Sequence, residues 1–255
     1  MLITLKLKFM VVISLVNHKG GVGKTTSTIN IGAGLAKKGF KVLVIDADPQ
    51  ANLSASLGIM EAQRSIYEAF RERERLPIIQ VKKNLDVVPS SMRFAKIERD
   101  LTSEIATETI LRELLEGVKQ NYDYCIIDCP PSLGLITINA LVVSSKIYIP
   151  MQAEYLAFMG MNSIVDIITL VKKYYNPKLE VSGVFFTMFN EKKLLAREVR
   201  KSVEQSFGDR VMDSTIRVNV ALSECQSNGV DIFEYDPNSN GAWDYGKLVD
   251  EILKN

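Results

Sequence analysis

The feature that most constrains the fold is a glycine-rich stretch near the N-terminus, where residues 18–26 read HKGGVGKTT. An apolar run at residues 11–16 precedes it, and a helical pattern with Ile29, Leu35 and Ala36 on one side follows it. A strand, a glycine-rich turn and a helix that opens on Gly-Lys-Thr form a phosphate-binding loop, because backbone N–H groups and the positive end of the helix dipole face the anion. We predict a nucleoside triphosphate site here; the alternative is a chance glycine turn before a helix.

The loop departs from the standard phosphate-binding motif at two positions. His18 stands where the standard motif has glycine, and Lys19 adds a second lysine to the expected Lys24. Lys24 is placed to reach the β- and γ-phosphates, and the Thr25 hydroxyl to ligate Mg²⁺.

The two-lysine form resembles the deviant Walker A loop of the ParA/MinD superfamily of dimerising ATPases, in particular its ParA (Soj-like) branch. The resemblance runs from about Met10 to the last helix. It implies that Lys19 reaches across a homodimer to the partner's nucleotide, and that Lys19 and Lys24 act in catalysis. The residues expected to bind ATP are Lys19, Gly20, Gly21, Val22, Gly23, Lys24, Thr25 and Thr26.

A first carboxylate strand is predicted at residues 41–50, which read KVLVIDADPQ. Asp46 and Asp48 follow an apolar run and share one side of the chain by period-two alternation. One carboxylate can accept hydrogen bonds from Mg²⁺-bound water while the other positions the attacking water; alternatively, an aspartate caps the turn before Pro49. The Asp-x-Asp-Pro-Gln motif resembles the ParA form, which implies that Asp48 positions the water and Asp46 belongs to the metal shell.

A second carboxylate strand is predicted at residues 122–134, which read YDYCIIDCPPSLG. Apolar residues ending in Asp128 are typical of a Walker B strand, whose carboxylate bonds a water on Mg²⁺. The Pro-Pro-Ser-x-Gly that follows closely resembles the switch II segment of the family. Cys125 and Cys129 could suggest a metal pair, but we favour buried thiols, because His18 is the only histidine in the chain.

The remaining pattern alternates strands and helices, which predicts an α/β fold with a doubly wound, mainly parallel sheet and helices on both faces. At 255 residues the chain is interpreted as one domain without an N-terminal helix-turn-helix, in which residues 1–9 are a flexible extension or an edge strand. Further strands are expected at residues 84–90, 146–150, 181–187 and 216–220, and further helices at 107–119 (or from 102), 155–174, 193–207 and 240–253.

Composition limits the partners that the whole molecule attracts. The net charge is +1, so binding to nucleic acid or membrane requires a local charged patch.

No apolar run is long enough to span a bilayer. Three cysteines without a disulfide framework fit a cytoplasmic protein. The C-terminal run at residues 248–254 is short and carries acids, which argues against a MinD-like basic membrane helix.

A basic stripe marks the predicted helix at residues 193–207. Leu195, Val199 and Ser202/Val203 fall on the opposite side, which should pack on the sheet while the cations face solvent. Two interpretations stay open: a surface for DNA phosphates, and an ordinary solvated face diluted by Glu198 and Glu204. The candidate DNA-binding residues are Lys193, Arg197, Arg200 and Lys201.

A last candidate is the loop that begins at Ile216. It resembles the family's Ile-Pro-Arg-Asn segment, which implies that Arg217 and Asn219 border the adenine. Asn219 could equally hold a loop turn. Val218 and Ala221 stand where ParA proteins often carry arginines, which weakens a DNA-binding role for this loop.

The resemblance implies an Mg²⁺-dependent ATPase whose ATP-sandwich homodimer binds nonspecific double-stranded DNA. It implies plasmid or chromosome segregation with a ParB-like, centromere-binding partner, no membrane, and association with the nucleoid in the ATP-bound state. The alternative is a ParA/MinD-like ATPase that positions a protein cargo or a division-site component. The sequence does not separate DNA cargo from protein cargo.

Overall fold

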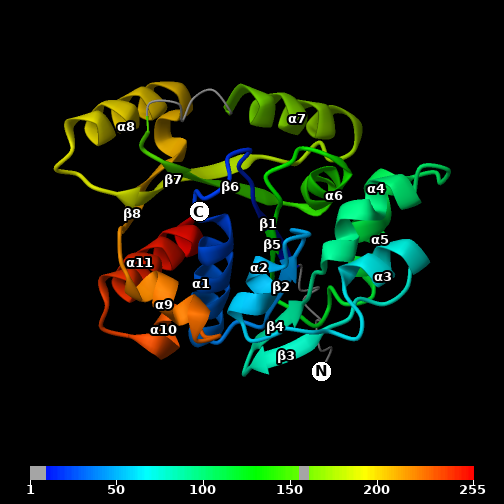
Figure 1. The fold of residues 1–255 in the computed structure, drawn as a ribbon. Coiled ribbons are helices and arrows are strands. Elements are labelled where there is room, and N and C mark those ends of the chain that lie inside the picture. The colour runs from blue at the N-terminus through cyan, green and yellow to red at the C-terminus, as the bar shows by residue number, and fades with distance from the viewer. Residues whose placement is uncertain (1–9, 155–160) are drawn as a thin grey trace, which may run out of the picture.

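The computed structural model of the chain describes residues 10–154 and 161–255. Within these residues the strands form an eight-stranded sheet in the order β3-β4-β2-β5-β1-β6-β7-β8 (Figure 1). All neighbouring pairs are parallel except β3 and β4. The predicted fold class is therefore confirmed. The strands are β1 Val11–Leu15, β2 Val42–Asp46, β3 Ile79–Lys82, β4 Leu85–Val88, β5 Tyr124–Asp128, β6 Lys146–Gln152, β7 Val181–Phe189 and β8 Val211–Arg217.

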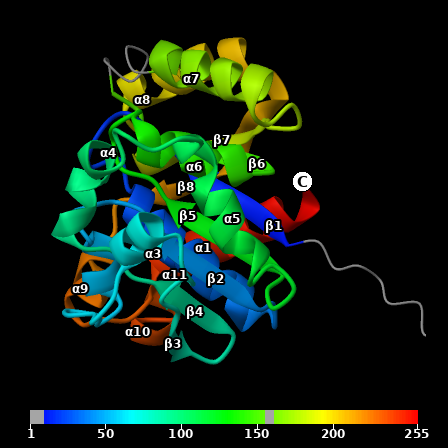
Figure 2. The same ribbon diagram turned by 90° about the vertical axis from the view of Figure 1, so that its right-hand side faces the viewer.

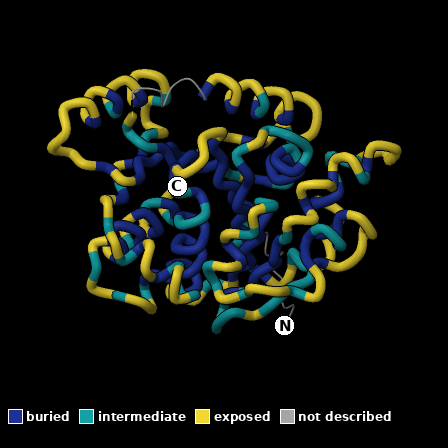
Figure 3. Tube along the Cα trace, viewed as in Figure 1, coloured by how far each residue is buried: buried dark blue, intermediate teal, exposed yellow. Residues whose placement is uncertain are grey.

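Helices cover both faces of the sheet (Figures 1 and 2). Buried side chains of α1 and α11 form one apolar core against the sheet, and those of α3 to α8 form the other. Figure 3 shows the sheet buried between these layers, with the outer sides of the helices exposed. The helices are α1 Lys24–Lys37, α2 Asn52–Ser56, α3 Ile66–Glu72, η1 Met92–Lys96, α4 Ile97–Asp100, η2 Thr107–Thr109, α5 Ile110–Glu116, α6 Leu135–Val143, α7 Met161–Tyr174, α8 Leu194–Phe207, η3 Gly208–Arg210, α9 Ala221–Ser227, α10 Ile232–Tyr235 and α11 Asn240–Lys254.

Close contact between α1 and the sheet depends on a small residue. A Cβ added at Gly32 would lie 2.8 Å from Cγ2 of Val44 in β2, which is closer than carbon atoms approach without displacement. The helix that follows the phosphate loop therefore lies directly on the strands, and its N-terminus is held at the carboxyl end of β1.

Several sequence expectations differ from the structure in detail. The edge strand β3 was not predicted, because its apolar residues are few and its one partner in the sheet is β4. The helix expected to reach residue 119 is shorter and ends at Glu116. Residues 1–9, and residues 155–160 of the helix expected at 155–174, lie outside the described residues. No helix in the described part of the chain is long and apolar enough to cross a membrane.

The packing expected for Leu195 is wrong, since this side chain is 47 % exposed. The buried stripe of α8 consists instead of Ala196, Val199 and Val203. These residues follow the i, i+3, i+7 spacing of one helix face, and Leu195 falls beside that face.

Candidate functional site

The phosphate loop joins β1 to α1 with two glycines in the left-handed region. Gly21 has φ 75° and Gly23 has φ 82°, a conformation that glycine adopts without the steric cost of a side chain. Gly23 is also the N-cap of α1 and offers no side-chain cap to the first turn. The first N–H groups of α1 therefore lack an intrahelical acceptor and are available to an anion.

Polar side chains from neighbouring strands hold this loop. Thr187 Oγ1, near the end of β7, donates a 2.8 Å hydrogen bond to the carbonyl oxygen of Val22. Gln152 Nε2, at the end of β6, donates one of 3.0 Å to the carbonyl oxygen of Gly21. Both holding residues were missed by sequence reasoning. The available signal was a polar residue at the carboxyl end of a predicted parallel strand, where ligand sites form.

Two further contacts fix the ends of the loop. Asn17 Nδ2 donates to the carbonyl oxygen of Pro150 at 2.8 Å, and its Oδ1 accepts from the Lys19 N–H at 2.9 Å. At the other end, Gln226 Nε2 in α9 donates to Thr26 Oγ1 at 2.8 Å. The loop therefore touches α9 as well as β6 and β7.

The two lysines of the loop have different surroundings. Lys24 is buried, and its Nζ donates to the carbonyl oxygen of Lys19 at 3.1 Å, so it points back over the loop. Burial lowers the pKa of Lys24, although the nearby carboxylate of Asp128 acts in the opposite direction. The ammonium of Lys19 is exposed and forms an ion pair with the carboxylate of Glu154, which follows β6.

Three carboxylates meet at the same edge of the sheet. Asp46 and Asp128 are opposite each other in the β2–β5 pairing, and Asp48 follows two residues after the end of β2. Thr25 Oγ1 donates a 2.7 Å hydrogen bond to Asp128 Oδ2, which joins the loop to the predicted Walker B strand. Asp46 accepts hydrogen bonds from the N–H and the hydroxyl of Ser54 at 2.9 and 2.6 Å.

The electrostatics of this edge suit a cation. Burial, and next the neighbouring Asp46 carboxylate, raise the pKa of Asp128 to about 8. Burial also raises the pKa of Asp46 to about 6. Two buried carboxylates beside a threonine hydroxyl are hard oxygen donors of the kind that Mg²⁺ prefers. A bound cation would relieve the repulsion between them, so the donor set fits Mg²⁺.

Arg217 and Asn219 are engaged within the chain. The Arg217 guanidinium forms hydrogen bonds of 2.6 to 3.1 Å with the carboxylate of Asp244 in α11. Asn219 Oδ1 accepts from the N–H of Ala221 at 2.9 Å, which is the loop-turn arrangement. Both residues lie at the carboxyl end of β8, and α9, which follows, contacts the phosphate loop through Gln226.

The basic stripe runs along α8, the helix at the upper left of Figure 1, and begins at its N-cap residue Lys193. Lys193, Arg197 and Lys201 are exposed and follow one another at four-residue intervals, so they form one row along the helix. Arg200 lies beside this row, and its Nε is 2.8 Å from Glu204 Oε1. The stripe therefore separates into a row of three cations and one cation that is already paired.

Comparison with known proteins identifies the family of this chain. A family profile described as an AAA domain matches residues 10–181. The sporulation initiation inhibitor protein Soj of Bacillus subtilis is 43 % identical over 249 residues, which cover 96 % of this chain and 98 % of Soj. The chain belongs to the ParA/Soj family. The chromosome partitioning protein ParA of Caulobacter vibrioides, another such relative, is 38 % identical over 95 % of this chain and 93 % of that protein.

Solved structures that resemble this ParA/Soj family member include two that hold a bound ATP analogue. Cobyrinic acid a,c-diamide synthase from Mycobacterium smegmatis, with bound ATP analog and magnesium, has a TM-score of 0.87 and 28 % identity over 96 % of this chain and 94 % of that one. A putative plasmid partition protein from Borrelia burgdorferi bound to AMPPNP has a TM-score of 0.81 and 28 % identity, over 96 % and 99 % of the two chains. The resemblance inferred from the loop motifs is therefore confirmed.

Proposed function

We propose that this chain is an Mg²⁺-dependent ATPase that hydrolyses ATP to ADP and phosphate. The observation that carries the proposal is the 2.7 Å hydrogen bond between Thr25 Oγ1 and Asp128 Oδ2. It brings together two motifs that are far apart in sequence and that phosphoryl-transfer sites use together. Support comes also from the solved relatives, one with an ATP analog and magnesium and one with AMPPNP.

Each residue of the site has a role in this proposal. Lys24 and the N–H groups of the loop would hold the phosphates, as positive groups around an anion. Thr25 would ligate Mg²⁺ directly, with Asp46 and Asp128 acting through its water ligands. Mg²⁺ bridges the phosphates and offsets the negative charge that develops during transfer. Asp48 is the least buried of the three carboxylates and would orient the attacking water.

The surroundings of the nucleotide involve more of the chain. Lys19 would leave Glu154 and reach the nucleotide of a second subunit, so that two subunits enclose two ATP molecules. Arg217 and Asn219 would border the adenine. In this proposal the chain acts as one ATPase domain.

We further propose that the ATP-bound homodimer binds double-stranded DNA without sequence preference and drives plasmid or chromosome segregation. The names of the relatives support this, since they include a chromosome partitioning protein and a plasmid partition protein. The row of Lys193, Arg197 and Lys201 on α8 offers phosphate contacts, and two such rows in a dimer would bind more tightly than one. A ParB-like partner would accelerate a slow basal turnover and release the protein from the nucleoid.

The test is sedimentation of the purified full chain with nonspecific duplex DNA or with anionic liposomes, in Mg²⁺ with ATP or ADP, alongside phosphate release. We expect phosphate release, and pelleting with DNA only under ATP and low salt. Pelleting with liposomes, or no DNA binding under ATP, would contradict the segregation proposal. Absence of phosphate release with and without DNA would contradict the ATPase proposal itself.

A further inference from the structure

The segment after Asp128, residues 129–135, connects the Walker B strand to α6 and is touched by two residues that the proposed function does not use. His18 Nδ1 lies 3.1 Å from the carbonyl oxygen of Pro131. Glu98 Oε1 accepts a 2.7 Å hydrogen bond from the N–H of Leu135, the first residue of α6. The first contact comes from the phosphate loop and the second from α4.

Glu98 supplies the cap that the sequence of α6 lacks. The N-cap of this nine-residue helix is Gly134, which has no side chain to accept from the first turn. The Glu98 carboxylate accepts instead from a distant part of the chain, where it also lies against the positive end of the helix dipole.

The Glu98 carboxylate lies in the space that a side chain at residue 134 would enter. Gly134 has φ −88° and ψ −160°, an extended conformation that any residue adopts, so its backbone does not require glycine. A Cβ at this position would overlap Glu98 Oε1, so the end of the Glu98 side chain would have to move. The glycine of the Pro-Pro-Ser-x-Gly motif therefore leaves room for the Glu98 carboxylate in the position that it occupies here.

Glu98 is presented by a short element that is firmly supported. The helix α4 has four residues, and Ile97 beside Glu98 is fully buried. The Tyr67 hydroxyl donates to Asp100 Oδ2 at 2.9 Å, which ties α4 to α3. The Arg93 guanidinium lies over the Tyr67 ring, 4.5 Å from its centroid.

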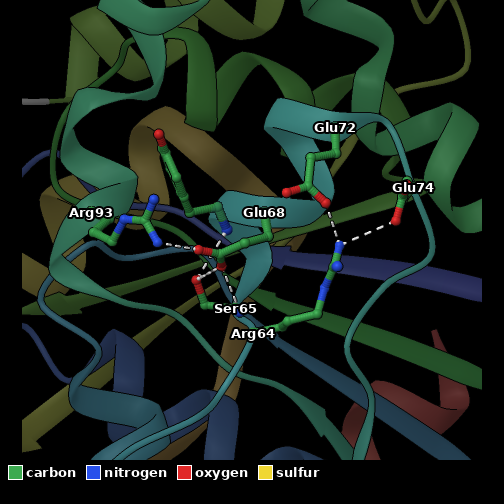
Figure 4. A network of polar contacts seen from close by, with 7 residues as sticks. Arg64, Ser65, Glu68, Glu72, Glu74 and Arg93 are labelled. Atoms are coloured by element: carbon green, nitrogen blue, oxygen red, sulfur yellow. Dashed lines mark hydrogen bonds and ion pairs between the residues drawn. The ribbon is translucent and has the colours of Figure 1, made fainter.

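The same Arg93 donates to Glu68 Oε1 at 2.6 Å, and Glu68 completes a capping box with Ser65 at the start of α3 (Figure 4). Figure 4 also shows Arg64 between Glu72 and Glu74, which braces the far end of the same helix. Through Tyr67 and Arg93, α3 is therefore joined to α4 and to η1, the two short helices at and before Glu98.

His18 is the other anchor. A carbonyl oxygen has no proton, so Nδ1 of His18 must be the donor to Pro131. His18 immediately precedes Lys19 in the phosphate loop, so this hydrogen bond links the loop to residues 129–135.

We propose that His18 and Glu98 are positioning residues that hold residues 129–135 from both ends and set their place beside the nucleotide. Neither residue touches the reacting atoms; each acts through the segment that follows Asp128. The inference rests on the proposed ATPase function for its effect on turnover, whereas the anchoring itself is measurable without nucleotide.

The first experiment measures hydrogen–deuterium exchange of the amides in residues 129–138 without nucleotide. Glu98→Ala and Gly134→Ala should each accelerate exchange at Leu135 by about fivefold, the size expected for loss of a helix cap. Glu98→Gln keeps the accepting oxygen and should stay near wild type. Lys96→Ala, an exposed change immediately before α4, is the matched control. Unchanged exchange in Glu98→Ala and Gly134→Ala would overturn the cap.

The second experiment compares His18→Ala with His18→Gln, whose amide N–H can still donate to Pro131. We expect His18→Ala to lower the kcat of ATP hydrolysis by about tenfold with little change in ATP affinity, and His18→Gln to restore most of it. In the double variant His18→Ala/Glu98→Ala, the fold decrease in kcat should be smaller than the product of the two single-variant decreases, because both residues act on one segment. The positioning role would be overturned if kcat fell equally in His18→Gln and His18→Ala. It would also be overturned if the decrease in kcat of the double variant equalled the product of the two single decreases. If wild type itself releases no phosphate, the proposed function fails while the exchange result still decides the anchoring.

Discussion

The ammonium of Lys19 is paired with the carboxylate of Glu154 in the same chain, although the two residues lie far apart in sequence. Both side chains are about half exposed, so the pair is screened by water and is a weak one. A weak pair holds Lys19 beside its own loop and still allows the lysine to leave. The structure therefore contains a competitor to the cross-subunit role proposed for Lys19.

The first prediction removes this competitor. Glu154→Gln should strengthen ATP-dependent dimerisation, by no more than about fivefold because exposed ion pairs contribute little. Sedimentation velocity with Mg²⁺-ATP measures the dimer fraction. Glu180→Gln is the control, since this exposed acid precedes β7 at the opposite end of the sheet. Weaker dimerisation of Glu154→Gln would instead assign Glu154 a direct role in the dimer.

The second prediction separates the two lysines of the loop. Lys24→Ala should lose nucleotide binding, because the buried ammonium lies over the loop proposed to hold the phosphates. Lys19→Ala should keep binding but lose ATP-dependent dimerisation and hydrolysis. Equilibrium binding of a fluorescent ATP analogue and light scattering with ATP measure the two properties. Normal dimerisation and hydrolysis by Lys19→Ala would exclude the cross-subunit role.

The third prediction concerns the carboxylate closest to solvent at the site. Asp48→Ala should still bind Mg²⁺-ATP and dimerise, while hydrolysis slows by a factor on the order of 10², as expected for a lost general base. Its dimer should persist, since hydrolysis is the proposed route of dissociation. Single-turnover phosphate release and light scattering test this. If Asp48→Ala lost ATP binding, Asp48 would be a structural residue or a metal ligand. Asp46 would then become the candidate base.

The fourth prediction locates the DNA surface. Changing Lys193, Arg197 and Lys201 together to Ala should weaken ATP-dependent DNA binding and flatten its salt dependence, because phosphate contacts release counterions. ATP-driven dimerisation should survive. Arg200→Ala is the control within the same helix, since Arg200 is paired with Glu204. Unchanged DNA binding by the triple variant would show that the DNA-binding surface lies elsewhere. Arg217 and Lys192 would then be the next candidates.

The fifth prediction tests the packing that positions the loop. Gly32→Ala should destabilise the fold by about 1–3 kcal/mol, because its Cβ would lie 2.8 Å from the Val44 side chain in a packed core. A Cβ added at Gly246 in α11 has no neighbouring atom within 4 Å. Gly246→Ala should therefore stabilise the fold by about 0.5–1 kcal/mol, because alanine has the higher helix propensity. Urea denaturation measures both. Equal effects would show that α1 can move away from β2.

Much of the fold and of the candidate site was predictable because its signals are local. The HKGGVGKTT loop, and apolar strands ending in Asp46 and Asp128, carry both their secondary structure and their chemistry within about ten residues. The alternation of strands and helices then predicts a parallel sheet, whose carboxyl edge collects all three motifs. By contrast, the burial of Leu195 was predicted wrongly, because the apolar stripe of α8 is narrower than its sequence suggests.

Only the tertiary structure determined the contacts between segments that are distant in the chain. Thr187 and Gln152 hold the phosphate loop, Glu154 pairs with Lys19, and Glu98 caps a helix that begins at residue 135. Each is a single polar side chain, and periodicity cannot indicate its partner because the partner is set by the order of strands in the sheet. The physical reason is that hydrogen bonds and ion pairs depend on positions within a few ångströms, which the chain reaches only after its apolar faces have packed.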